Sequence, residues 1–160
     1  MKEFPSTLKH ITLWLLLGTA VFVAVLAWQA QQQKTQFSAR GGVIELRRGA
    51  DGHFHWPGRV NGVAVEFLVD TGATRTALPQ AVAELAGLVR EGRVRSSTAG
   101  GTVQGWTGRA DLQLQGGVRA QRLTITVLPS LDAPLLGMDM LSRLRFSQTD
   151  GVLTLRPANE

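Results

Sequence analysis

The first clear pattern in the chain is a long apolar run near its start. Residues Ile11 to Gln33 carry no charge, and Ile11 to Ala30 is almost entirely apolar. A helix rises about 1.5 Å per residue, so twenty such residues span about 30 Å, the thickness of the hydrocarbon core of a bilayer. Trp14 and Trp28 lie near the two ends, where indole rings prefer the membrane interface. The run therefore predicts a single transmembrane helix over residues 11–30.

Two other structures fit this apolar run less well. A cleaved signal peptide is the main alternative, because Val25-Leu26-Ala27 resembles a cleavage site, but the run is longer than a usual signal core. A buried helix of a soluble domain would need polar positions on one face, and the run has none. Basic residues flank both ends and do not settle the orientation. We expect an uncleaved anchor, with residues 1–10 as a short cytoplasmic tail.

After the apolar run, the pattern changes to short segments separated by turns. Residues 31–42 are polar and end at Gly41-Gly42, which predicts a linker or stalk. Alternating or apolar segments, typical of strands, follow at 43–46, 53–60, 63–69, 94–98, 103–114, 122–128 and 152–155. Short helices are expected at 79–86 and 138–144, the first opened by a proline and stopped by a glycine. Residues 43–160 therefore predict one all-β domain, a barrel or sandwich with one or two short helices.

Composition narrows the class of protein further. About 125 residues remain after the apolar run, enough for one domain with a hydrophobic core. The chain has no cysteine, which excludes a disulfide framework, a thiolate metal site and a cysteine nucleophile. The formal net charge is +5, but the arginines are scattered and tyrosine is absent, so a nucleic-acid partner is not expected. The charge indicates a solvated surface, and attraction to anionic lipid or to an acidic partner is the weaker alternative.

Candidate chemistry begins where the apolar strand at 63–69 runs into Asp70-Thr71-Gly72. A strand end fixes the backbone of an aspartate, and the glycine leaves an unobstructed N–H for the carboxylate. The hydroxyl of Thr71 can donate to and accept from another chain segment. A simple turn is the alternative, because roughly several per cent of chains this long contain such a tripeptide by chance. The tripeptide is therefore informative only in its context.

That context resembles the retropepsin-like, or retroviral-type, aspartic protease family. Residues 67–74 read FLVDTGAT, and residues 135–141, about sixty positions later, read LLGMDML. A glycine-rich hairpin at 94–105 lies between them. The resemblance covers roughly residues 54–155, and the apolar run adds a similarity to the bacterial, membrane-anchored members of the family. It implies a closed β barrel that holds half of an active site.

The resemblance also implies roles for individual residues of the first motif. Asp70 would match the catalytic aspartate, and Thr71 the threonine that bonds to the loop of a partner chain. Gly72 would match the glycine that donates its N–H, and Ala73 completes the active-site loop.

Two further segments have counterparts in the family. The flap that closes over substrate would include Ala99, Gly100, Gly101 and Thr102. The segment packed beneath the catalytic loop would be Leu135, Leu136 and Gly137. The flap assignment has an ordinary alternative, since any hairpin can be rich in glycine.

The chain supplies one aspartate of this kind, whereas aspartic protease chemistry needs two facing carboxylates. None of its other aspartates is followed by Thr or Ser and then Gly; these are Asp51, Asp111, Asp132, Asp139 and Asp150. We therefore expect a homodimer in which two Asp70 carboxylates share a proton and a bound water on the two-fold axis.

The expected activity is that of a membrane-anchored aspartic endopeptidase with no metal and no cofactor. Its substrate would be an extended segment of a protein or peptide near the membrane. Its location would be a bacterial inner membrane, with the protease domain in the periplasm. A non-catalytic dimeric peptide-binding or scaffold module of the same fold is the main rival, and a β-domain adaptor unrelated to proteases is a third possibility.

One departure from the retroviral pattern concerns a stabilising ion pair. Retroviral enzymes usually carry an acidic residue after D-T-G-A and an arginine after the downstream glycine. Here those positions hold Thr74 and Met138. Arg75 and Asp139 lie one residue further along and could pair instead to brace the catalytic loop. Two unrelated surface charges are the alternative, which the sequence favours slightly.

Other candidate sites are weaker. His53 and His55 alternate along one predicted strand, a spacing that zinc ligands can have, but no third ligand has a matching spacing. We therefore expect a partly exposed strand edge there. The chain contains no G-x-S-x-G motif, and its glycine-rich stretches lack the Lys-Ser/Thr ending of a phosphate loop.

Overall fold

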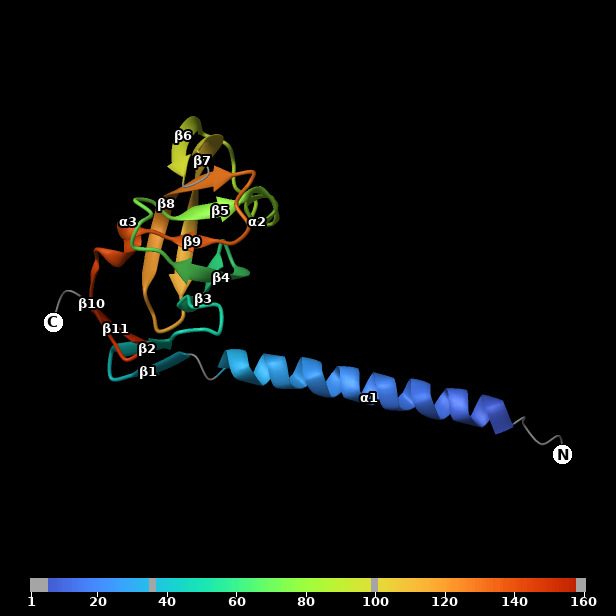
Figure 1. Ribbon diagram of the computed structural model, residues 1–160. Coiled ribbons are helices and arrows are strands. Elements are labelled where there is room, and N and C mark those ends of the chain that lie inside the picture. Colours follow the sequence, from blue (N-terminus) through green and yellow to red (C-terminus); the bar gives the residue numbers. More distant parts are fainter. Residues whose placement is uncertain (1–5, 35–36, 99–100, 158–160) are drawn as a thin grey trace. The chain divides into compact units, whose positions relative to one another are not determined.

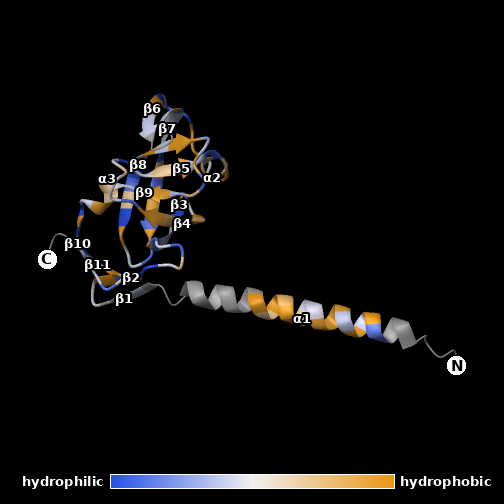
Figure 2. Cartoon of the chain, in the orientation of Figure 1, coloured by the Kyte–Doolittle hydropathy of each residue, from blue (hydrophilic) through white to orange (hydrophobic). Residues whose placement is uncertain are grey.

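The computed structural model describes residues 6–34, 37–98 and 101–157 (Figure 1). The chain divides into two compact units, residues 1–35 and residues 36–160. The first unit contains helix α1 (Ser6–Lys34), whose described part is mostly apolar (Figure 2). Over the residues that the structure describes, no helix meets the length and hydropathy needed to cross a membrane. The transmembrane helix expected over residues 11–30 stays a prediction.

The second unit begins with a four-stranded antiparallel sheet. Its strands, in the order in which they pair, are β1 (Phe37–Arg40), β2 (Val43–Arg47), β11 (Val152–Pro157) and β10 (Leu144–Thr149). Gly41 and Gly42 both have positive φ and form the tight turn that returns β1 onto β2. Residues 31–42 therefore differ from the predicted stalk, because helix α1 continues to Lys34 and residues 37–40 form an edge strand.

A larger, seven-stranded sheet makes up the rest of the domain. Its strands pair in the order β3 (His55–Val60), β4 (Val63–Val69), β9 (Leu135–Leu136), β5 (Ala77–Pro79), β8 (Arg119–Leu128), β7 (Gly101–Leu114) and β6 (Gly92–Thr98). Strand β3 also pairs with β7. Gly58 allows this pairing, because a Cβ there would lie 2.7 Å from the carbonyl oxygen of Gln113. The closed barrel stays a prediction.

Two short helices complete the fold, so the all-β prediction with one or two short helices is confirmed for this domain. They are α2 (Gln80–Leu85), which follows Pro79, and α3 (Met138–Leu141). Helix α2 lies against β5, and α3 leads into β10.

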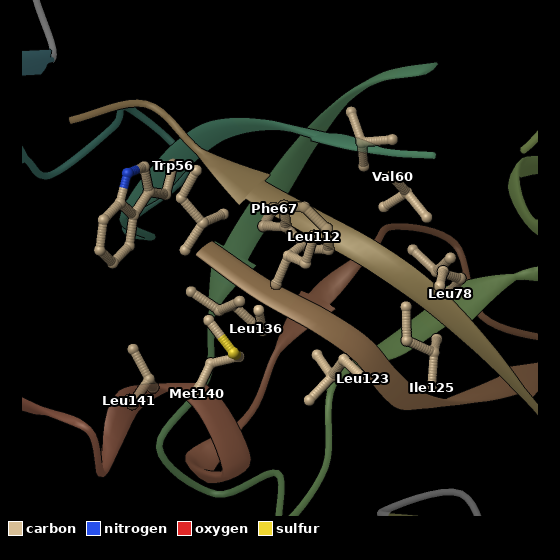
Figure 3. Packing of buried hydrophobic residues seen from close by; sticks show 14 of the residues in the cluster. Trp56, Val60, Phe67, Leu78, Leu112, Leu123, Ile125, Leu136, Met140 and Leu141 are labelled. Carbon is tan, nitrogen blue, oxygen red and sulfur yellow. The ribbon is translucent and has the colours of Figure 1, made fainter. Parts of the chain in front are cut away.

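The core is built from the inward faces of the strands (Figure 3). In β4, Val65 and Phe67 are buried while Glu66 between them is exposed, as the alternation of the sequence predicts. Trp56 is fully buried, and its indole N–H donates to the carbonyl oxygen of Gln115 at 2.9 Å. Burying large side chains of this kind contributes about 1.5–3 kcal/mol each. This core holds the end of β4 in a fixed position.

Candidate active site

Asp70 follows directly after the last residue of β4 and is half-buried. Its backbone N–H donates to the carbonyl oxygen of Leu136 in β9 at 3.0 Å, and its own carbonyl oxygen accepts from the N–H of Ala73 at 3.3 Å. The first bond continues the pairing of β4 with β9, and the second closes a turn. The carboxylate of Asp70 therefore stands on a backbone that is bonded on both sides.

The backbone of the loop after Asp70 orients the Asp70 carboxylate. The N–H of Gly72 donates to Asp70 Oδ1 at 2.9 Å, as the sequence predicted for this glycine. The other carboxylate oxygen, Oδ2, makes no hydrogen bond to any residue that the structure describes. Thr71 is exposed, and its hydroxyl likewise has no partner within the described residues. Both groups are available to another molecule.

Strand β9 and helix α3 support this loop. Strand β9 pairs in parallel with the end of β4, with Leu135 opposite Leu68 and Leu136 opposite Val69. Beyond the strand, the N–H groups of Met138 and Asp139 donate to carbonyl oxygens of the loop at 2.8 and 3.2 Å. Figure 3 shows Leu136 of β9 and Met140 and Leu141 of α3 among the buried core side chains. The downstream motif thus ties the loop after Asp70 to the core.

Gly137 makes the closest contact between the two segments. A side chain at this position would place its Cβ 2.4 Å from the carbonyl carbon of Arg75 and 2.7 Å from the backbone N of Thr76. Such distances are far inside van der Waals contact, so only glycine allows the segment to pass beneath the loop. The glycine in LLG is therefore required by space rather than by a positive φ, since its φ is −91°.

The ion pair between Arg75 and Asp139, the less favoured of the two alternatives in the sequence, does not form. No salt bridge joins these two residues, both of which the structure describes. Both carboxylate oxygens of Asp139 accept from the N–H of Thr76 at 3.0 Å, and Oδ1 also accepts from the Thr76 hydroxyl at 2.8 Å. Asp139 therefore does brace the loop after Asp70, but through Thr76, which is fully buried.

Thr76 was not predicted from the sequence as a site residue. Its hydroxyl also accepts from the N–H of Gly137 at 3.3 Å. A buried threonine, bonded to both Asp139 and Gly137, thus joins the loop after Asp70 to the start of α3. In the sequence, Thr76 is recognisable only as a polar residue directly before a buried strand. Its role in supporting the loop becomes evident once the structure places the Asp139 carboxylate beside it.

A cleft of about 670 Å³ lies over Asp70. Its lining comes from Asp70 and the loop after it, from strands β5, β6, β8 and β9, and from the loop before β9. It consists of Asp70, Gly72, Ala73, Thr74, Arg75, Ala77, Val94, Arg95, Ser96, Ser97, Thr126, Leu128, Leu131 and Leu135. The predicted loop residues Gly72 and Ala73 and the predicted Leu135 are thus brought together around Asp70. Leu136 and Gly137 lie beneath the loop instead.

The predicted flap corresponds to the β6–β7 hairpin. Ala99 and Gly100 lie outside the described residues. Gly101 and Thr102 pair with Thr98 and Ser97 and do not line the cleft. The part of the hairpin that lines the cleft is residues 94–97 of β6. The sequence predicted them as part of a strand but not as site residues, because Val-Arg-Ser-Ser has no distinctive motif.

The two histidines do not form a metal site among the described residues. His53 precedes β3, and His55 at the start of β3 contacts Asp51 at 2.8 Å and Glu66 at 3.9 Å. Asp51 is exposed, and hydrogen bonds from the backbone N–H of His53 and from the His55 ring hold its pKa below the usual value. The partly exposed contact between Asp51 and His55 stabilises the turn before β3.

Known proteins are similar to the part of the chain that contains Asp70 and the segment packed against its loop. The profile of the family described as "gag-polyprotein putative aspartyl protease" matches residues 56–143. The chain belongs to the retropepsin-like aspartic protease family. The matched segment runs from β3 through Asp70 and the β6–β7 hairpin to the residues that follow α3.

Individual relatives of this retropepsin-like protease are viral and bacterial. The Gag-Pol polyproteins of Koala retrovirus and Gibbon ape leukemia virus are 35% and 36% identical to it over 89 and 86 residues, which is 54% of this chain in each case. The matched part spans about 5% of those polyproteins. The crystal structure of a retropepsin-like aspartic protease from Rickettsia conorii is 27% identical, with a TM-score of 0.60 over 76% of this chain and 94% of that one.

Proposed function

We propose that the domain is an aspartic endopeptidase in which Asp70 activates the water that attacks a peptide bond. The observation that supports this most directly is that Asp70 lines the cleft with a carboxylate held in a defined orientation. One of its oxygens is held by Gly72, and the other has no partner within the described residues. A carboxylate held in this way can accept a proton from a bound water without losing its orientation.

The proposed enzyme is a homodimer, because the chemistry needs a second carboxylate. Among the described residues that line the cleft, Asp70 is the one acidic side chain. Two carboxylates about 3 Å apart share one proton, so one member is ionised and the other is protonated. The exposed hydroxyl of Thr71, next to Asp70, is available to bond the loop of a second copy.

The reaction then proceeds through complementary roles of the two aspartates. The ionised carboxylate takes a proton from the water as its oxygen attacks the peptide carbonyl carbon. The protonated carboxyl donates to the developing oxyanion, and a proton is delivered to the leaving amine when the C–N bond breaks. The substrate would lie as an extended segment under the β6–β7 hairpin.

Mixing experiments test whether two copies make one site. The wild-type domain starting at Gln36 would be mixed with a ninefold excess of the Asp70→Asn domain, at concentrations where pairing is saturated. Random pairing leaves about one tenth of the wild-type protein in pairs with two aspartates, so the cleavage rate should fall to about one tenth. The rate is measured with a fluorogenic peptide, and pair formation is followed by native mass spectrometry.

The control for the mixing experiment is an equal excess of an unrelated protein, which should leave the rate unchanged. An undiminished rate while mixed pairs demonstrably form would show that one copy is sufficient, and the dimer mechanism would be wrong.

We further propose that residues 11–30 anchor the enzyme in a bacterial inner membrane, with the domain in the periplasm. The sequence supports this, because no charge occurs from Ile11 to Gln33. Large apolar side chains from Ile11 to Val25 are also exposed along α1.

The anchor has a simple test in bacterial cells. The full chain should sediment with membranes, resist extraction by high salt and be released by detergent, whereas a chain that starts at Gln36 should not sediment. Protease added to spheroplasts should degrade the domain of the full chain. Recovery of the intact full chain in the soluble fraction would contradict the proposal.

A further inference from the structure

We infer that the cleft selects acidic peptides, namely segments in which an apolar side chain is flanked by Asp or Glu residues that meet Arg75 and Arg95. This inference rests on the proposed function and adds a class of substrate to it. It starts from the charges of the cleft. Asp70 supplies its one acidic side chain, whereas Arg75 and Arg95 reach it from the catalytic loop and from β6.

Both arginines are free to meet a substrate. Each is exposed, and neither forms a salt bridge within the described part of the chain. This distinguishes them from Arg109, which pairs with Glu91 at 3.3 Å. Exposed guanidinium groups without a carboxylate partner retain their full capacity for bidentate bonds to an acidic side chain.

A second pocket extends the positive surface away from Asp70. This pocket of about 300 Å³ is lined in part by Arg75, Arg122 and Arg143, so Arg75 belongs to both the pocket and the cleft. Asp139 also lines it, but both of its carboxylate oxygens are bonded to Thr76. The arginines of this pocket are therefore not neutralised by a direct ion pair with it, and a peptide leaving the cleft past Arg75 would meet more positive charge.

The apolar residues that line the cleft account for the expected preference for an apolar side chain in the substrate. Its apolar side chains are Ala73, Ala77, Val94, Leu128, Leu131 and Leu135. These come from six different segments, so together they form a wall that suits one or two apolar side chains near the scissile bond. Asp132 is the acidic residue next in sequence to a cleft-lining residue, Leu131. It is exposed and does not itself line the cleft.

The expected size of the effect follows from exposure. Interactions between exposed charges amount to a few tenths to about 1 kcal/mol, which corresponds to roughly a two- to fivefold change in kcat/KM for each acidic residue. Because salt screens exposed charges, the preference should shrink as ionic strength rises from about 0.05 M to about 0.5 M. In a homodimer, the same two arginines would occur on both sides of the scissile bond.

Matched peptides test this inference. Peptides that share one apolar centre and carry acidic, neutral or basic flanks would be given to the wild-type domain, to Arg75→Glu/Arg95→Glu and to Arg93→Glu/Arg119→Glu. The second variant has the same change in net charge, at exposed arginines that do not line the cleft. Wild type and the control should prefer acidic flanks, and Arg75→Glu/Arg95→Glu should prefer basic flanks.

The outcomes separate the inference from the proposed function. Equal rates on all flanks at low salt, or the same preference in both double variants, would overturn the inference and leave the protease assignment intact. Cleavage of no peptide by any protein would contradict the protease assignment itself. If Arg75→Glu/Arg95→Glu does not fold, the salt dependence of the wild-type preference decides, because a preference that does not depend on salt would also overturn the inference.

Discussion

Replacing Asp70 with asparagine should abolish peptide hydrolysis, with kcat/KM falling by at least about a thousandfold. Asparagine has the same shape and keeps an oxygen that can accept from the N–H of Gly72, so the loop should remain in place. It cannot accept a proton from water at neutral pH, and a pair of asparagines cannot share one. The variant therefore removes the proposed chemistry while it leaves the cleft intact.

Activity and folding need to be measured on the same preparation. Hydrolysis of a peptide pool by the domain starting at Gln36 gives the activity, and thermal unfolding followed by circular dichroism gives the stability. Asp132→Asn is the matched control, because Asp132 is exposed and lies outside the cleft lining. Undiminished hydrolysis by the Asp70 variant would reject the assignment of Asp70.

The same variant separates the enzyme from its rival. A non-catalytic peptide-binding module would bind peptides equally well with asparagine at position 70 and would cleave none with either residue. Binding without cleavage by the wild-type domain would therefore favour the module over the protease.

Gly137→Ala should destabilise the domain by about 3 kcal/mol and lower its melting temperature by roughly 10 °C. The added Cβ would lie 2.4 Å from the carbonyl carbon of Arg75 and 2.7 Å from the N of Thr76. Both are backbone atoms and cannot rotate away. The loop and the start of α3 must then separate, which weakens the bonds between Thr76 and Asp139 and displaces Asp70.

Urea unfolding of the domain measures the loss of stability, and Gly92→Ala is the matched control. At Gly92 the nearest atom to an added Cβ is the Thr107 hydroxyl oxygen at 3.0 Å, which belongs to a side chain that can move. The control should remain within about 1 kcal/mol of wild type. A Gly137 variant as stable as the control would show that the loop and α3 are not held as tightly as these distances indicate.

Local sequence patterns correctly predicted the parts of the structure that depend mainly on residues close together in the chain. Alternation in β4 predicted which side chains face the core, and Pro79 predicted the start of α2. Strand β1 was missed because its four residues look like part of a polar linker. They become a strand only when β2 offers its backbone N–H and C=O groups.

The site shows the same division. The bond from Gly72 to Asp70 is made within three residues, and it followed from the tripeptide itself. The partner of Asp139 did not, because Thr76 lies 63 residues away in the chain. Charge alone indicated Arg75 as that partner, but a carboxylate beside a buried backbone N–H and hydroxyl satisfies groups that would otherwise be costly to bury.

By itself, the sequence determined an all-β domain, a strand that ends in an aspartate, a glycine that can donate to its carboxylate, and the family to which the motifs belong. The tertiary structure decided that Thr76 joins Asp139 and that Gly137 must lack a side chain. It also decided that two arginines, neither with a carboxylate partner among the described residues, line the cleft with Asp70. The physical reason is that short-range backbone preferences are encoded in adjacent residues. Contacts between distant segments depend on packing, which fixes which polar groups are buried together.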